Sequence, residues 1–271
     1  MSTNKIKYVL QLADNALILG HRISEWTGHG PILEQDIAIT NTALDHLGQA
    51  RSLYQYAADL YNKLSTEEKQ DFFASPAFIN LEQTITEDTL AYLRDAWDFR
   101  NSLLVEQPNA DWAYTIARSF LYDNYSFLLY SELKKSNDET LAAIAEKSLK
   151  EVQYHLRWSS EWVIRLGDGT DESKARMQEA LDERWAYFGE LFIASEADNA
   201  MLAEGTAPDI ESLRSTWDSN VARVLDEATL TMPAADAWMQ TGGKDGNHSE
   251  HLGYILAEMQ YMQRAYPGME W

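Results

Sequence analysis

Residues 109–166 read NADWAYTIARSFLYDNYSFLLYSELKKSNDETLAAIAEKSLKEVQYHLRWSSEWVIRL. The stretch is rich in Ala, Leu, Glu and Lys, which favour helices, and it contains no proline. One polar triplet, Ser136-Asn137-Asp138, interrupts it and is typical of a turn. The stretch therefore predicts two long antiparallel helices over residues 109–135 and 139–166.

A second pair of long helices precedes this one. Apolar residues recur at helical spacing over residues 5–27 and 33–63, and the breaker Gly28-His29-Gly30-Pro31 separates the two runs. Two hairpins of long helices are the components of a four-helix bundle. We therefore expect an all-α protein with a ferritin-like four-helix bundle.

The remaining segments also favour helices. They cover residues 84–106, 171–204, 209–228 and 248–266, while residues 66–80 hold a short helical piece and a connection that contains Ser75-Pro76. No run alternates between polar and apolar residues like a strand, and no dinucleotide or phosphate-loop motif occurs. The glycine-rich stretch Thr241–Gly246 follows no strand, so we interpret it as a tight connection into a helix. We expect one helical domain over residues 1–271, with additional C-terminal helices beside the bundle.

Composition excludes several classes of protein. The chain has 271 residues, 45% of them hydrophobic, which is enough to bury a sizeable core. It has no cysteine, which excludes disulfides, thiolate metal sites and a thiol nucleophile. A net charge of −21 disfavours binding to nucleic acid or to an anionic membrane. No signal peptide or membrane-spanning segment is evident, so we expect a cytoplasmic protein.

Bundles of this kind often hold two metal ions between carboxylates and histidines of the four helices. In an antiparallel hairpin, residues equally far from the turn lie at one level. With turns near residues 30 and 137, Asp45 pairs with Asn15 and its neighbour Asp14, and Glu151 pairs with Asp123. We therefore expect Asp14, Asp45, Asp123 and Glu151 to meet at one level of the bundle.

The histidines do not complete such a site. The residues three positions after Asp45 and Glu151 are Gly48 and Tyr154, where Glu-x-x-His motifs would place histidines. Of the six histidines, only His248 follows an acid by three positions, and it lies beside the glycine-rich stretch. We interpret the four acids, with His155, as a degenerate metal site, and we expect neither bound metal nor a catalytic residue in this chain.

Two questions stay open at this level. Glu151 and His155 are four residues apart on one helix face, so they could bind a metal together or simply hydrogen-bond to each other. Arg22 and Arg51 are the only Arg or Lys residues between positions 8 and 62. Either arginine could supply the positive charge that a metal would otherwise provide, or both could lie at the surface.

Several short motifs, in this order, carry a resemblance to a known family. They are Glu25-Trp26, Gly28-His29, Leu47-Gly48-Gln49-Ala50-Arg51, Glu106-Gln107-Pro108-Asn109, Glu151–Arg157, Thr241-Gly242-Gly243-Lys244, His248–Gly253, Glu258–Tyr261 and Pro267-Gly268. Together they resemble the C subunits of the bacterial ring 1,2-phenylacetyl-CoA epoxidases, over nearly the whole chain.

The resemblance implies a role in aerobic phenylacetate degradation. In that family the A subunit holds the di-iron centre and binds phenylacetyl-CoA, while another subunit delivers electrons from NADPH. The resemblance implies that the present chain is a ferritin-like structural partner of the A subunit, without a working metal site or cofactor of its own. The chain alone is then expected to form a homodimer and to lack oxygenase activity.

Two alternatives to a structural subunit remain. One is a ferritin-like di-metal oxygenase or oxidase with unusual ligands. The other is a helical interaction or storage protein unrelated to oxygenation. Metal content separates the structural subunit from the first alternative, and co-purification with a di-iron partner separates it from the second.

Overall fold

The computed structural model describes residues 3–70, 72–79, 84–234 and 237–269. Within these ranges the regular elements are helices, and no residue lies in a β-strand. The predicted all-α fold class is therefore confirmed. No helix in the described part of the chain is long and apolar enough to cross a membrane.

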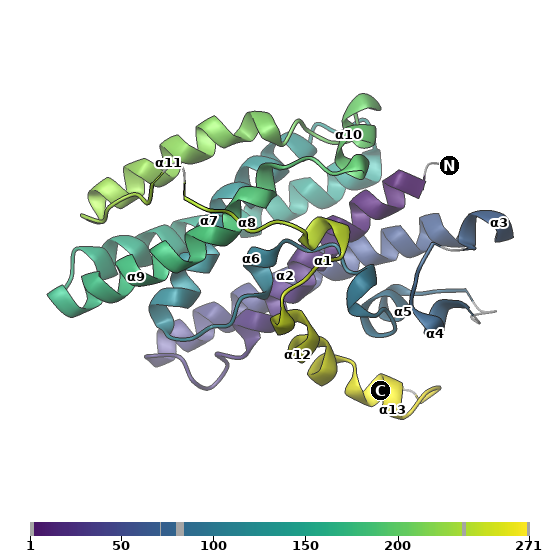
Figure 1. Cartoon of the computed structure of the whole chain (residues 1–271), viewed down its shortest axis with the longest axis horizontal. Helices are drawn as coiled ribbons and strands as arrows, with labels where there is room; N and C mark the ends of the chain where they lie inside the picture. Colours follow the sequence, from purple (N-terminus) through teal and green to yellow (C-terminus); the bar gives the residue numbers. More distant parts are fainter. Residues whose placement is uncertain (1–2, 71, 80–83, 235–236, 270–271) are drawn as a thin grey trace.

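Four long helices form the central bundle (Figure 1). They are α1 (Thr3–Ser24), α2 (Leu33–Asn62), α7 (Trp112–Leu133) and α8 (Glu139–Gly167). The most extensive helix contacts join α1 to α2 and α7 to α8, and α2 also packs against α8. The two predicted hairpins are confirmed, with helix ends that differ by a few residues from the expected ones.

Asp138 links the two hairpins at one end of the bundle. Its carboxylate accepts the backbone N–H of Leu141 at 3.1 Å, which caps the start of α8. The same carboxylate accepts hydrogen bonds from Lys5 of α1 at 2.8 Å and from the Tyr56 hydroxyl of α2 at 2.7 Å. The predicted turn therefore also holds the hairpins together.

Further helices cover the bundle on two sides (Figure 1). Helices α9 (Asp171–Phe188) and α11 (Arg214–Glu227) pack against α7 and α8, and α10 (Glu196–Ala203) packs against α1. Trp217 of α11 is fully buried and stacks on Phe188 with ring centroids 4.4 Å apart. Its indole N–H donates to the Leu121 carbonyl oxygen at 3.1 Å, which fixes α11 to α7.

The single helix predicted over residues 84–106 is wrong. This segment forms α5 (Glu87–Tyr92), the short 3-10 helix η1 (Ala96–Asp98) and α6 (Leu103–Glu106). The backbone N–H of Arg100 donates to Asp14 at 2.8 Å, and that of Ser102 donates to Asn15 at 2.9 Å. Because these N–H groups bind side chains of α1, they are not available for a continuous helical ladder.

The single helix predicted over residues 171–204 is also wrong. Helix α9 is followed by the 3-10 helix η2 (Gly189–Phe192), and α10 starts separately. Ser195 begins α10 with a capping box, in which its hydroxyl accepts the Asp198 N–H at 3.1 Å and the Asp198 carboxylate accepts the Ser195 N–H at 2.8 Å. The break turns Glu190 into the interior.

Glu190 explains the glycine-rich stretch. Its buried carboxylate accepts the N–H groups of Gly242 at 3.0 Å and Gly243 at 3.1 Å, and also that of Leu103. A Cβ atom on Gly243 would overlap the carbonyl oxygen of Asn101, so only glycine fits there. The stretch is a structural connection that binds a carboxylate of its own chain.

The remaining elements are short. They are α3 (Thr66–Lys69), α4 (Pro76–Ile79), η3 (Glu211–Leu213), η4 (Gly243–Asp245), α12 (Glu250–Met259) and α13 (Tyr261–Ala265). The predicted helix over 248–266 is thus divided at Gln260, whose side-chain amide donates to the carbonyl oxygens of Ala91 at 3.0 Å and Arg94 at 2.9 Å. Helix α12 packs against α1 and α6.

Candidate metal centre

The four carboxylates expected at one level of the bundle do not all meet there. Asp45 and Asp123 lie beside His155, but Asp14 accepts a hydrogen bond from the hydroxyl of Tyr54 at 2.5 Å, nine residues beyond Asp45 along α2. In the other hairpin, Asp123 accepts from the Ser159 hydroxyl at 2.8 Å, eight residues beyond Glu151. The predicted pairing is therefore shifted by about two helical turns in both hairpins.

The direction of helical side chains contributes to this shift. Side chains point back toward the N-terminus of their own helix. In a hairpin, the incoming helix therefore directs its side chains away from the turn, and the outgoing helix directs them toward it. Counting equal numbers of residues from the turn ignores this direction. It therefore pairs each residue of the incoming helix with a residue of the outgoing helix that lies too close to the turn.

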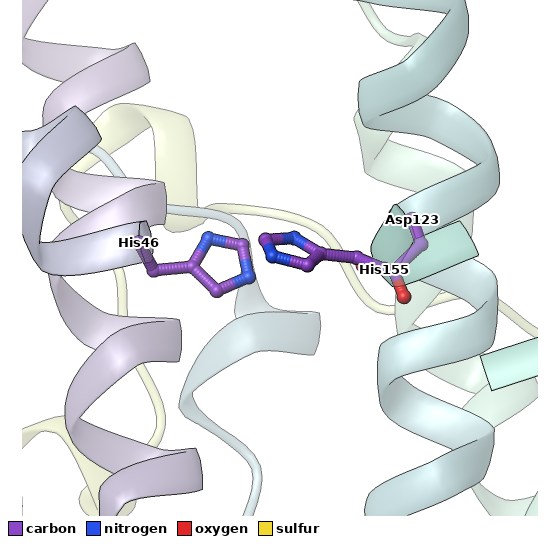
Figure 2. A group of neighbouring side chains, drawn as sticks. All are labelled: His46, Asp123 and His155. Atoms are coloured by element: carbon purple, nitrogen blue, oxygen red, sulfur yellow. The ribbon is translucent and has the colours of Figure 1, made fainter. Parts of the chain in front are cut away.

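Three buried side chains meet at the centre of the bundle, where the sequence predicts a degenerate metal site. They are His46 of α2, Asp123 of α7 and His155 of α8, and one ligand atom of each lies within 4.8 Å of the others. Figure 2 shows the two imidazole rings facing each other between the helices, with Asp123 beside His155. The ring centroids are 4.9 Å apart.

Burial controls the charges in this cluster. All three side chains are at most 2% exposed. Burial lowers the pKa of His46 well below its usual value, and the neighbouring His155 and the Arg118 guanidinium lower it further. Burial also raises the pKa of Asp123 to about 6, although His155 and the Ser159 hydrogen bond oppose that rise. His46 is therefore neutral at pH 7.

Groups around the cluster orient two of its members. The carboxylate of Asp45 contacts Nε2 of His155 at 3.0 Å, and the Ser159 hydroxyl binds one oxygen of Asp123. The Nδ1 atoms of His46 and His155 are buried and have no hydrogen-bond partner. Two imidazole nitrogens that could accept a proton or a metal ion thus remain unsatisfied inside the protein.

This set does not fit two metal ions. A ferritin-like di-iron site uses about six protein ligands drawn from all four helices. Here three ligand atoms converge among the described residues. At this level α1 contributes Gly20, where even a Cβ atom would lie 3.2 Å from the Cβ of His46. The described residues therefore bring together fewer ligands than a ferritin-like di-iron centre uses.

The histidine with the acid-x-x-His spacing has a structural role. Nδ1 of His248 contacts Glu106 at 2.9 Å, and its Nε2 contacts the carbonyl oxygen of Phe99 at 3.0 Å. Glu106 also accepts the N–H of Ser249 at 2.7 Å, at the start of α12. Both ring nitrogens are used, so His248 is not available to a metal ion, and Asp245 does not act with it.

The predicted contact between Glu151 and His155 is absent from the described part of the chain. Glu151 is half-buried and accepts a hydrogen bond from Gln49 at 2.9 Å, whereas His155 contacts Asp45. Side chains four residues apart share a face, but here each finds its partner on α2. Glu151 therefore belongs to the rim between α2 and α8, outside the buried cluster.

Replacing Glu151 with alanine is accordingly expected to reduce the free energy of unfolding by about 0.5–1.5 kcal/mol, the worth of one hydrogen bond. Urea denaturation measures this effect. Glu151→Gln keeps an acceptor for Gln49 and should unfold like the unmodified protein. A loss above about 3 kcal/mol for Glu151→Ala would instead place the carboxylate in a buried charge network.

In the described part of the chain no hydrogen bond or ion pair joins Arg22 or Arg51 to the cluster, and Arg51 takes the surface role that was the second alternative for it. Arg22 donates to the carbonyl oxygen of Glu106 and to Glu25, and Arg51 is an exposed partner of Glu87. The cation near the cluster is Arg118 of α7, which is fully buried and donates to the carbonyl oxygen of Gln107. Burial lowers the pKa of Arg118 to about 9, assisted by the nearby Arg184 and Arg22.

Asp14 forms a buried ion pair with Arg94. Arg94 contacts both oxygens of the Asp14 carboxylate, at 2.5 and 3.1 Å, and both side chains are fully buried. The guanidinium also donates to the carbonyl oxygens of Leu90 at 2.6 Å and Asp98 at 3.0 Å, and to the Tyr54 hydroxyl at 3.0 Å. Asp14 therefore has a structural role.

Sequence reasoning missed His46 and Arg94. His46 follows Asp45 directly, so a search for acid-x-x-His spacing excludes it. His46 could have been found by looking for histidines of α2 and α8 that lie at the same level of the bundle, after allowing for the direction in which helical side chains point. Arg94 lies in the broken segment outside the bundle helices, and nothing in the sequence connects it to Asp14.

Comparison with known proteins identifies the class. The chain belongs to the phenylacetic acid catabolic protein family, whose family model matches residues 1–271. This confirms the resemblance found in the sequence. The chain is 46% identical over 264 residues to a protein of Escherichia coli (strain K12) that is named as the C subunit of 1,2-phenylacetyl-CoA epoxidase. The alignment covers 97% of this chain and 98% of that relative.

Proposed function

We propose that this chain is a non-catalytic, structural subunit of a phenylacetyl-CoA epoxidase in the cytoplasm. It supports a separate catalytic A subunit, which holds the di-iron centre. The observation that carries the proposal is the 46% identity to the C subunit of the Escherichia coli epoxidase, across nearly the full length of both chains. The whole chain acts as one helical domain in this role.

The chemistry of the bundle centre supports a non-catalytic role. Two irons need more ligands than His46, Asp123 and His155 provide, and α1 presents Gly20 where another ligand would lie. Oxygen activation at two irons is therefore assigned to the partner. The alternative, a di-metal oxygenase in its own right, requires a second set of ligands that does not converge among the described residues.

An apolar stripe on α2 supports the presence of a partner. Leu33, Ile37 and Leu44 are 72%, 53% and 61% exposed and share one face of the helix. Exposed apolar side chains along one face of a helix are typical of a subunit interface.

The charge of the chain is consistent with division of labour between subunits. A net charge of −21 repels the anionic tail of coenzyme A, so a basic binding pocket is assigned to the A subunit. Stable hetero-subunit interfaces bury about 2,000 Å² or more and favour aromatic residues. Alone, the chain uses an overlapping apolar surface to form a homodimer.

Native mass and iron content, measured with and without the A subunit, test the proposal. The expected result is a homodimer alone, a stable complex when the A subunit is added, and iron that follows the A subunit. One or two irons per chain in the isolated protein would favour the oxygenase alternative. Failure to associate with the A subunit would favour an unrelated interaction protein.

Replacing Leu44 with glutamate tests the apolar stripe. A charge buried at the centre of an interface is expected to weaken association with the A subunit about 10- to 100-fold, while the fold keeps its stability because Leu44 is exposed. Association can be measured by calorimetry. The matched control is Leu202→Glu on α10, which is 40% exposed. Equal affinities for the two variants would place the interface elsewhere.

A further inference from the structure

We propose that His46, Asp123 and His155 bind a single zinc ion. Their ligand atoms converge within 4.8 Å from three helices of the bundle. Zinc in proteins takes imidazole nitrogens and carboxylate oxygens at about 2.0–2.2 Å, usually in a tetrahedron. Binding requires the three side chains to rotate until these atoms reach such distances from one ion, with a water molecule as the fourth ligand.

The two unsatisfied nitrogens point to a ligand because, unlike the other unpaired polar atoms of the interior, both belong to the cluster of possible metal ligands. Buried polar atoms without partners are rare in proteins, because each costs free energy. Nδ1 of His46 and Nδ1 of His155 both lack a hydrogen bond, although both rings are at most 1% exposed. A metal ion accepts electron pairs from such nitrogens and removes that cost.

The surrounding groups match the outer ligands of metal sites. A metal-bound histidine almost always places its other nitrogen against a carboxylate or carbonyl oxygen. Nε2 of His155 contacts Asp45 in this way, which leaves Nδ1 for the metal ion. Ser159 binds one oxygen of Asp123 and leaves the second oxygen for coordination.

Charge and ligand type favour zinc over iron. The two carboxylates, Asp45 and Asp123, outweigh the guanidinium of Arg118, so the site attracts a cation. Imidazole sites bind Zn²⁺ more tightly than Fe²⁺ under otherwise equal conditions. The cluster joins α2 to α7 and α8, so a bound ion cross-links the two hairpins and stabilises the bundle.

Zinc titration of the full-length, chelator-treated protein tests the site. Equilibrium dialysis with elemental analysis should give one zinc per chain, and the thermal unfolding midpoint should rise with zinc concentration. Cobalt substitution should give the visible absorption of a tetrahedral ion. His46→Gln and His155→Gln should each remove the bound zinc and the cobalt spectrum, and Asp45→Asn should weaken binding about 10- to 100-fold.

The exposed His29 provides a matched control, because His29→Gln removes an imidazole that is not part of the cluster and should bind zinc normally. Circular dichroism of each variant shows whether the helices are intact. Zinc binding that survives His46→Gln in a folded protein would overturn the proposal. So would the absence of zinc binding to the unmodified chain, or tighter binding of Fe²⁺ than of Zn²⁺.

Discussion

Replacing Arg94 with alanine is expected to lower the free energy of unfolding by about 3–5 kcal/mol, a large fraction of the stability of a typical domain. The reason is that the substitution leaves a buried carboxylate without a cation, which costs free energy. Asp14 is fully buried, and its carboxylate would lose the only cation that contacts it among the described residues. Urea denaturation followed by circular dichroism measures the change.

Arg51→Ala is the matched control for this prediction. Arg51 also pairs with a carboxylate, that of Glu87, but its side chain is 72% exposed, so its removal should cost less than about 1 kcal/mol. The double variant Arg94→Met with Asp14→Leu removes both charges and should lose less stability than the sum of the single changes. Equal losses for Arg94→Ala and Arg51→Ala would show that the buried ion pair contributes little.

Omitting this chain from a reconstituted epoxidase is expected to reduce turnover to background. The mixture contains the A subunit, the reductase, NADPH, oxygen and phenylacetyl-CoA, and product formation measures turnover. The physical reason is mass action. A catalytic subunit that folds around a large shared interface is stabilised only while its partner is bound. This chain alone, with the same substrates and reductase, should give no product.

Adding the chain back should restore turnover, and the Leu44→Glu variant should restore it only at higher concentrations. The variant Glu151→Gln, which keeps the fold and lies outside the buried cluster, should restore it fully. An A subunit that is soluble and fully active without this chain would refute the structural role. Product from this chain alone would instead support an oxygenase.

The sequence predicted the bundle because long helices with polar turns are encoded locally. The run over residues 139–166 and its cap at Asp138 need no distant partner to be recognised. The breaks within residues 84–106 and 171–204 have a different origin. They depend on side chains far away in sequence, such as Asn15 binding the Ser102 N–H and Glu190 binding the Gly242 N–H. Local propensity does not contain that information.

The candidate site was predicted only in part, because the position of a residue along its helix can be counted from the sequence but the direction of its side chain was left out. Counting along the helices placed Asp45 and Asp123 near the bundle centre, and the spacing of four residues from Glu151 added His155; the structure places both carboxylates beside His155. The count failed for Asp14 and Glu151 because it used only the positions of residues along the helix axes and ignored the direction of their side chains. His46 was excluded by a spacing rule for two-metal sites, and three ligands around one ion obey no such spacing.

The contact between α12 and α1 also has a consequence for synthesis in the cell. Helix α1 is buried from Ile6 to Ile23 around most of its circumference, but α12, one of the helices that cover it, begins at Glu250. At about 5–20 residues per second, a ribosome needs roughly 10–45 s to make the intervening chain. Helices α2, α6 and α10 are made earlier and provide most of the contacts with α1, so throughout that interval only the part of α1 that contacts α12 lacks its cover. Chains released before the glycine-rich stretch should therefore form the bundle but expose this part of α1 to solvent or to chaperones.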